Sequence, residues 1–169
     1  MGKRLLLPIV KKLVRLRLLS REDLPLTLGW RNQDNIRKWF FYSALITPEQ
    51  HENWYREYQE RDDDFVFIIE DASNGFRPVG QVAIYHIDWE GLRAEFGRLM
   101  IGELSAAGKG LARASTQAVL QLAFDQFNLQ EVYLEVYTDN LRAISLYESV
   151  GFKTIDAREA VTRMSLSKP

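Results

Sequence analysis

The sequence has 169 residues but no cysteine and only two histidines, His51 and His86. Without cysteine the chain can form no disulfides, no zinc–thiolate sites and no thiol nucleophiles. The two histidines fall in separate segments, so they do not indicate a metal site, and we expect none. His51 falls on a predicted surface helix and is assigned no role.

Long apolar runs and an excess of charge are also missing. No run approaches the length that crosses a membrane, and the net charge of −1 gives no general reason to expect binding to nucleic acid. The apolar residues 5–10 are interrupted by Pro8, and no small-residue cleavage site follows. We therefore interpret them as an N-terminal strand or arm and not as a signal peptide. The sequence predicts a cytoplasmic protein with one domain over residues 1–169 and with neither a membrane nor a nucleic-acid partner.

A glycine-rich turn is the strongest local motif. Residues 105–112, SAAGKGLA, follow a strand-like run at 94–101 and precede a helix-like run at 112–127. The first N–H groups of a helix have no intrahelical partner, and the macrodipole adds partial positive charge. Gly108 and Gly110 allow close approach of the backbone, and Lys109 adds a cation. The turn therefore predicts a phosphate or pyrophosphate site, although a tight turn without a ligand has the same pattern.

The familiar phosphate motifs do not explain this turn. The chain has no G-x-x-x-x-G-K-[ST], and Arg113 occupies the place of the third glycine in G-x-G-x-x-G. The second half of the chain supplies context. Residues 131–137 alternate as a strand does, Asn140 is a candidate helix N-cap, and Gly151 is placed to end the following helix.

Residues 140–152, NLRAISLYESVGF, resemble the second signature of the GNAT superfamily of acyl-CoA-dependent N-acyltransferases, N-x-x-A-x-x-L-Y-x-x-x-G-F. The turn at Gly108 and Gly110 resembles the pyrophosphate loop of the same superfamily, at the expected distance upstream. The resemblance extends from about Leu16 to the C-terminus. One position departs from it, because Ser105 stands where the family loop usually has glutamine or arginine.

The resemblance implies an α/β (α+β) fold, with a GNAT-like mixed, mostly antiparallel sheet, splayed central parallel strands and flanking helices. Period-two runs predict strands, and caps with helical spacing predict helices. The predicted strands are residues 13–19, 65–69, 79–86, 94–101, 131–137 and 160–166. The predicted helices begin at Ser20 and at Thr47, span 34–42 and 112–127, and follow Asn140.

The resemblance also implies acetyl-CoA as the cofactor, bound where the strands at 94–101 and 132–137 splay apart. Splaying leaves backbone groups unpaired, and the pantetheine amides would pair with them. A backbone N–H near Met100 or Ile101 would polarise the acyl carbonyl. The predicted cofactor-binding residues are Leu99, Met100, Ile101, Ala107, Gly108, Lys109, Gly110, Leu111, Ala112, Asn140, Ala143 and Tyr147.

Two residues are the predicted catalytic groups. Tyr147 is the candidate general acid, since a phenol with an unperturbed pKa of about 10 holds its proton at neutral pH. Its spacing alone also fits a core tyrosine. Glu95 is the candidate general base, acting directly or through water, and its alternative is a structurally paired carboxylate. His86 at a strand end also suits the amine proton, because an unperturbed imidazole has a pKa of about 6.5.

The aromatic segment at residues 39–42 falls where the family builds its acceptor pocket. Aromatic faces and an arginine suit a sugar or a nucleotide, and the alternative is that about half of these residues are core. The predicted substrate-binding residues are Arg31, Trp39, Phe40, Phe41, Tyr42 and His86. The pattern W-R-N-x-x-x-I-R-K-W resembles nucleotide-amino-sugar N-acetyltransferases more closely than ribosomal-protein Nα-acetyltransferases.

The sequence thus predicts an acetyl-CoA-dependent N-acetyltransferase whose partner is a small-molecule primary amine, most specifically an amino sugar on a nucleotide carrier. Two different functions stay open. One is acetylation of a protein N-terminus, and the other is a non-catalytic CoA-binding module, for which Ser105 is the reason. A homodimer is compatible with the sequence.

Overall fold

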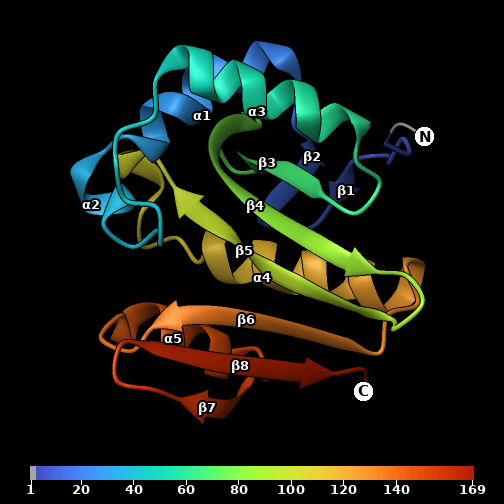
Figure 1. The fold of residues 1–169 in the computed structure, drawn as a ribbon. Coiled ribbons are helices and arrows are strands. Elements are labelled where there is room, and N and C mark those ends of the chain that lie inside the picture. Colours follow the sequence, from blue (N-terminus) through green and yellow to red (C-terminus); the bar gives the residue numbers. More distant parts are fainter. Residues whose placement is uncertain (1–2) are drawn as a thin grey trace.

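The structure, a computed structural model, describes residues 3–169 and contains one eight-stranded sheet with the order β1-β2-β3-β4-β5-β6-β8-β7 (Figure 1). Every neighbouring pair is antiparallel except β5 and β6, which are parallel. The predicted mixed sheet with one central parallel pair is therefore confirmed. The strands are β1 (Ile9–Val10), β2 (Val14–Leu18), β3 (Phe65–Asp71), β4 (Arg77–Asp88), β5 (Arg93–Ile101), β6 (Glu131–Tyr137), β7 (Lys153–Ala157) and β8 (Val161–Ser167).

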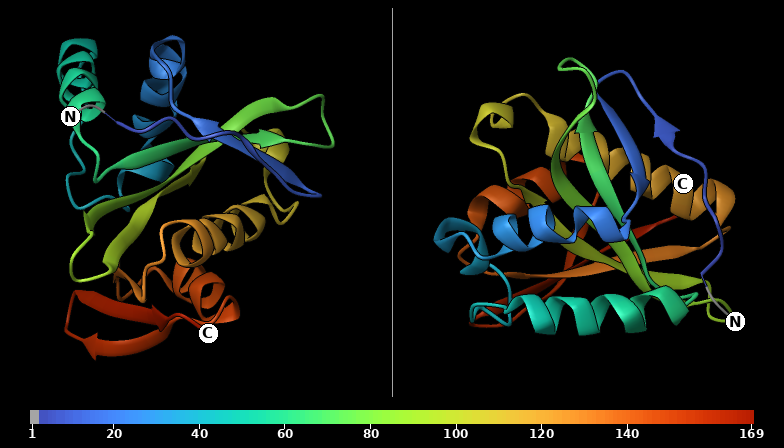
Figure 2. Two further views of the ribbon diagram at one scale, coloured as in Figure 1. Left: turned by 90° about the vertical axis from the view of Figure 1, so that its right-hand side faces the viewer. Right: turned by 90° about the horizontal axis from the view of Figure 1, so that it is seen from above.

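Helices cover both faces of this sheet (Figure 2). They are α1 (Leu24–Arg31), α2 (Asp34–Arg37), α3 (Pro48–Glu60), α4 (Leu111–Gln121) and α5 (Leu141–Ser149). The capping box of α3 forms as the sequence predicts, since the Thr47 side chain accepts from the Gln50 N–H and the Gln50 side chain accepts from the Thr47 N–H. A π-helical turn (Leu122–Gln126) continues α4. The helices α1 and α3 lie on one face of the sheet, and α4 and α5 lie on the other.

The strand β3 connects the two halves of the core, because all seven of its residues are buried. Phe65, Phe67 and Ile69 pack in the cluster that includes α4 and α5. Val66 and Ile68 point the other way and pack against residues of α1 and α3. The apolar run at residues 65–69 is thus continuous because both faces of β3 are covered by helices.

The parallel pairing of β5 with β6 is short. It joins Arg93, Ala94 and Glu95 to residues 131–133 and then stops. On its other side β5 carries an extra residue opposite Val82, and Arg98 there has a φ of 51°. Such a bulge bends its strand and increases the local twist. The two strands therefore diverge toward their C-terminal ends, as predicted.

Two expectations about the elements are wrong. The helix expected over 34–42 ends at Arg37, and residues 39–42 form turns and bends. The Arg31 guanidinium donates to the Tyr42 carbonyl and the Arg37 guanidinium donates to the Ser43 carbonyl, so side chains and not helical N–H groups satisfy these two carbonyls. The strand β7 was not predicted, since all five of its residues are exposed and carry no alternation. Of residues 5–10, which were expected to form an N-terminal strand or arm, only Ile9 and Val10 form a strand, β1.

None of the helices in residues 3–169 has the length and apolar character needed to span a bilayer.

Replacing a buried aromatic residue of β3 tests this packing. Phe67 is 0% exposed, so Phe67→Ala leaves a cavity and is expected to lower the free energy of unfolding by about 3–5 kcal/mol. Ile155→Ala on the edge strand β7, where the side chain is 57% exposed, is the matched control and should stay within about 0.5 kcal/mol. Chemical denaturation measures both. Equal losses would contradict the placement of β3 at the centre.

Candidate active site

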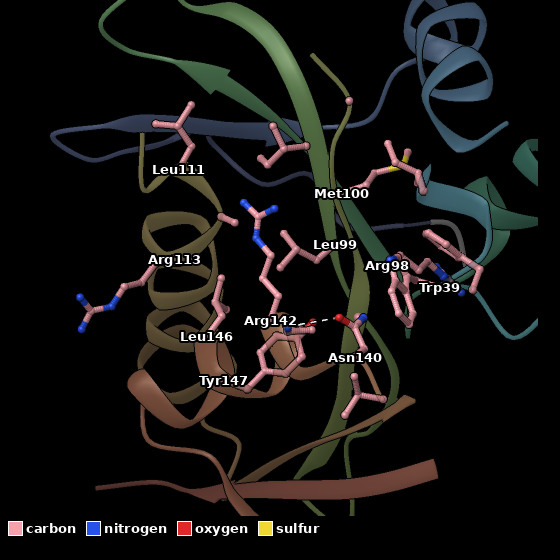
Figure 3. A pocket seen from close by; sticks show the side chains of 18 of the residues that line it. Trp39, Arg98, Leu99, Met100, Leu111, Arg113, Asn140, Arg142, Leu146 and Tyr147 are labelled. Atoms are coloured by element: carbon pink, nitrogen blue, oxygen red, sulfur yellow. Dashed lines mark hydrogen bonds between the residues drawn. The ribbon is translucent and has the colours of Figure 1, made fainter. Parts of the chain in front are cut away.

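A cavity of ≈ 580 Å³ opens between β5 and β6, where their pairing stops (Figure 3). One wall is β5 and its continuation, residues 96–104. The opposite wall consists of residues 134–136 of β6 and the first two turns of α5. The loop before α4 closes one end of the cavity, and residues near α2 border the other. The predicted coenzyme loop, α5 and aromatic segment thus meet in one place.

The loop before α4 has the geometry of a phosphate site. Gly108 and Gly110 have φ values of 75° and 78°, which only glycine adopts without strain, and Gly110 is the N-cap of α4. A Cβ built at either position would meet nothing within 4 Å, so the backbone faces open space. The first N–H groups of α4 have no intrahelical partner. These features fit the pyrophosphate of a coenzyme.

The cations around this loop differ from the prediction. The Lys109 ammonium lies 3.1 Å from a carboxylate oxygen of Asp71, whose side chain is 1% exposed, and Lys109 does not line the cavity. Two arginines that we did not predict do line it. Figure 3 shows Arg142 reaching from α5 toward the N-terminal end of α4, and Arg113 on the first turn of α4. The fixed positive charge of Arg142 suits a phosphate, whereas the Arg113 guanidinium points away from the other labelled side chains and lies 3.4 Å from the Ser149 carbonyl.

The predicted pantetheine-binding residues Leu99, Met100 and Ile101 all line the cavity. Because β5 has left β6 at this point, its backbone on that side has no strand partner. The remaining predicted cofactor-binding residues that line the cavity are Ala107, Gly108, Gly110, Leu111, Ala112, Asn140, Ala143 and Tyr147.

Tyr147 lies on the wall formed by α5. The Asn140 side chain accepts a hydrogen bond from the Ala143 N–H at 3.3 Å and so caps this helix. The Tyr147 ring packs between Phe96 and Phe152, with ring centroids 5.8 and 5.9 Å away. This apolar burial raises the pKa of Tyr147 to about 12. Tyr147 is therefore a packed residue whose ring also lines the cavity.

The aromatic segment at the far end is exposed. Trp39, Phe41 and Tyr42 are 38%, 53% and 60% exposed, and Phe40 is half-buried, so none of the four is a core residue. Trp39, Phe40 and Phe41 line the cavity, whereas Tyr42 does not. Arg31 is buried beneath the segment, where its guanidinium stacks on Phe40 at 4.3 Å and donates to the Tyr42 carbonyl. Arg31 thus supports the segment and does not face the cavity.

Glu95 and His86 also lie behind the cavity wall. The Glu95 carboxylate accepts from the Tyr85 hydroxyl at 2.8 Å, and its second oxygen lies 3.1 Å from His86 Nδ1. Tyr85 does line the cavity, as does Arg98, whose guanidinium stacks on the Tyr85 ring at 4.0 Å. Neither was predicted. Only the register of β4 against β5 brings Tyr85 to Glu95, and two bulges set that register.

The described residues 3–169 contain no group of three or more side chains placed to hold a metal ion.

A splayed parallel pair beside a glycine loop at a helix N-terminus is the arrangement expected of an acyl-CoA-dependent transferase. A family model described as acetyltransferase (GNAT) domain matches residues 14–153. The chain belongs to this family and is an acetyl-CoA-dependent N-acetyltransferase that acts on amines.

Relatives support this assignment. The chain is 31% identical over 137 residues to spermidine N(1)-acetyltransferase of Vibrio cholerae, and the match covers 81% of this chain and 77% of the relative. A crystal structure of the Vibrio cholerae spermidine N-acetyltransferase in complex with CoA and spermine superposes with a TM-score of 0.83 at 28% identity and covers 94% of this chain and 97% of that one. A domain from Methanocaldococcus jannaschii superposes with a TM-score of 0.80 at 27% identity and covers 91% of this chain and 97% of that chain.

The glycine loop can be tested by a bulky substitution. Gly110→Val places a branched side chain in the open space before α4 and strains a φ of 78°. We expect acetyl-CoA affinity, measured by calorimetry, to fall by about 10²-fold or more, since several contacts to one phosphate group are lost together. Gly75→Val is the matched control, because Gly75 has a φ of 60° and equally open surroundings in the turn between β3 and β4, away from the cavity. Parental affinity in Gly110→Val would exclude this loop as the phosphate site.

Proposed function

We propose that the acceptor is the primary amine of an amino sugar carried on a nucleotide. The exposed aromatic rings of Trp39 and Phe41 at the cavity are the observation that carries this proposal. Such rings stack on sugar faces and on bases at low cost in conformational entropy. Residues 38–47 contain no carboxylate, so this end of the cavity has aromatic rings and no acidic groups from that segment.

A polyamine is the second candidate, because relatives at about 30% identity are named spermidine acetyltransferases. A polyamine carries several positive charges and calls for carboxylates that are free to receive them. Two glutamates line the cavity. Glu103 accepts from the Trp30 indole at 2.9 Å and lies 3.8 Å from the Arg77 guanidinium, and Glu135 lies 4.0 Å from the Arg163 guanidinium. Glu103 is held by its partners and Glu135 is half-exposed, so at most one carboxylate is left for a polyamine that carries several charges, and the amino sugar is the better fit.

A non-catalytic CoA-binding module and a peptide acetyltransferase have less support. Ser105, the reason for considering a non-catalytic module, is exposed in a short 3₁₀ turn (Leu104–Ala106) and does not line the cavity. The serine that stands here in place of the usual glutamine or arginine is therefore not one of the residues that line the cavity. A peptide N-terminus needs an open groove, and no feature of the cavity favours one. The single domain over 1–169, the homodimer and the cytoplasmic location stay predictions.

Acetyl transfer needs a polarised carbonyl, an unprotonated amine and a proton for the leaving thiolate. In the proposed mechanism a backbone N–H near Met100 or Ile101, where β5 has no partner strand, polarises the carbonyl. Tyr147 gives its hydroxyl proton to the thiolate as the carbon–sulfur bond breaks. The apolar surroundings raise the pKa of Tyr147 to about 12, so its hydroxyl still holds its proton when the thiolate forms.

A turnover screen tests the acceptor. The panel contains nucleotide-linked amino sugars, free amino sugars, spermidine and short peptides, each with acetyl-CoA. The proposal expects kcat/KM for a nucleotide-linked amino sugar to exceed that for spermidine by at least about 10²-fold, because only the sugar matches both the aromatic and the cationic groups. A faster reaction with spermidine would replace the proposal with the polyamine candidate.

The aromatic contact itself is tested in the same assay. Phe41→Ala should raise the acceptor KM about 3- to 10-fold, corresponding to an aromatic contact worth about 0.5–1.5 kcal/mol. Acetyl-CoA affinity should stay at the parental value. Tyr42→Ala is the matched control, since Tyr42 is a neighbouring exposed aromatic residue outside the cavity lining. Equal effects of the two variants would contradict the assignment of Phe41.

Removing one hydroxyl tests the general acid. Tyr147→Phe keeps the ring and its packing, so stability should change little, whereas kcat should fall by about 10²-fold or more if the proton matters. Acetyl-CoA affinity should change much less, because the interaction belongs to the transition state. With the pKa of Tyr147 raised to about 12, the parental rate should show no decline from this group at ordinary alkaline pH. If chemistry is rate-limiting and Tyr147→Phe keeps the parental kcat, Tyr147 is not the general acid and its role is packing alone.

A further inference from the structure

We propose that Tyr85 takes the proton of the reacting amine while passing its own hydroxyl proton to Glu95, and that His86 holds the Glu95 carboxylate in place. This inference rests on acetyl transfer to an amine and does not depend on which amine the enzyme accepts.

The first observation is the position of the Tyr85 hydroxyl. Tyr85 lines the cavity, and its hydroxyl donates to Glu95 Oε2 at 2.8 Å. A Cβ built on Gly97 would lie 2.8 Å from Tyr85 Oη, so the hydroxyl rests directly over this glycine of β5. Gly97 lies two residues beyond the last parallel pair, where β5 parts from β6. The hydroxyl is therefore at the cavity wall close to the predicted thioester position.

The second observation is that the Glu95 carboxylate does not reach the cavity directly. Glu95 is not part of the cavity lining, whereas Tyr85 is. Both oxygens of the carboxylate already have partners, since Oε2 accepts from Tyr85 and Oε1 lies 3.1 Å from His86 Nδ1. A proton from the cavity reaches Glu95 through the Tyr85 hydroxyl.

The third observation is the bulge that holds the three residues together. Between the pairs Tyr85–Glu95 and Asp88–Arg93, β4 contains one residue more than β5, and His86 there has a φ of 48°. In a regular strand consecutive side chains point to opposite faces. The bulge instead brings the rings of Tyr85 and His86 within 4.7 Å of each other, and both contact Glu95. A non-glycine residue at positive φ costs conformational energy, which is typical of functional sites.

The charges around Tyr85 keep it protonated in the resting enzyme. Burial is the largest cause that raises the pKa of Tyr85, and the Glu95 carboxylate raises it further, against the opposing charge of Arg98. Arg98 is in turn held at 2.8 Å from Asp64. A hydroxyl that does not ionise can still relay a proton by accepting one as it gives one. Among the other titratable groups, Asp63 lies near His86 and Tyr133 lies near Glu95, while Arg93, Glu135 and Arg163 surround Tyr133.

The transfer conserves atoms and charge. The amine nitrogen forms a bond to the acyl carbon and the carbon–sulfur bond breaks, with the sulfur taking the proton of Tyr147. The nitrogen loses one proton to Tyr85 Oη while the Tyr85 proton moves to Glu95 Oε2. Glu95, whose side chain is 18% exposed, then releases this proton to water, and water restores the proton of Tyr147. The net products are the amide and the free thiol.

Single and double variants test the relay. Tyr85→Phe and Glu95→Gln should each lower kcat by about 10²-fold near neutral pH, with parental acetyl-CoA affinity. The double variant should be no slower than either single variant, because residues that act as one unit do not add. His86→Asn, which tolerates positive φ, should give a smaller loss in kcat, since it disturbs only the position of the carboxylate.

The pH profile separates a relay from a packing role. In Tyr85→Phe and Glu95→Gln the deficit in kcat should shrink as pH rises, because hydroxide and the free amine replace the missing base. Tyr133→Phe is the matched control, since Tyr133 lies opposite Glu95 on β6 but outside the cavity lining, and its rate should be parental at every pH. The assay uses the amine that the parental enzyme acetylates fastest, so failure of the amino-sugar proposal leaves this test intact.

Three results would overturn the relay: a parental kcat in Tyr85→Phe, a deficit that is the same at all pH values, or fully additive losses in the double variant. An enzyme that acetylates no amine would overturn both the relay and the proposed function.

Discussion

The active site depends on the early separation of β5 from β6. Their parallel pairing covers only three residue pairs, after which the bulge at Arg98 turns β5 away. Unpaired backbone groups at a buried position are costly unless a ligand satisfies them. The same separation makes room for the cavity, exposes Leu99, Met100 and Ile101 to it, and brings Tyr147 of α5 opposite them. A sheet with full pairing would have no site for the thioester.

Charge pairing decides which polar groups remain for ligands. Lys109 is paired with the buried Asp71, Arg98 with the buried Asp64, and Glu103 with Trp30 and Arg77. Such partners reduce the charge that these groups offer to a substrate and fix their positions. Within residues 3–169, no carboxylate lies within salt-bridge distance of Arg142, which lines the cavity beside the glycine loop. The end of the cavity at the glycine loop therefore has an arginine that is unpaired among the described residues, and the end near α2 is mainly aromatic.

Much of the fold and of the coenzyme end follows from local sequence. The apolar run of β3, the capping box of α3, and the glycines before α4 each have a local physical cause that is visible in the residues themselves. Trp39, Phe40 and Phe41 of the aromatic segment border the cavity, but the helix expected there does not form, and arginine side chains donate to the Tyr42 and Ser43 carbonyls. The exposed strand β7 had no pattern by which it could be found.

The sequence alone determined the family, the order of the main elements and the cavity walls at the glycine loop and α5, because these depend on residues near one another in the chain. The tertiary structure decided which titratable side chains meet. Lys109 is paired with Asp71, Arg31 lies under the aromatic segment, and Glu95 stands behind Tyr85. Each contact joins segments that are far apart in sequence or depends on a bulge. A bulge shifts the register by one residue and so changes which side chains face each other.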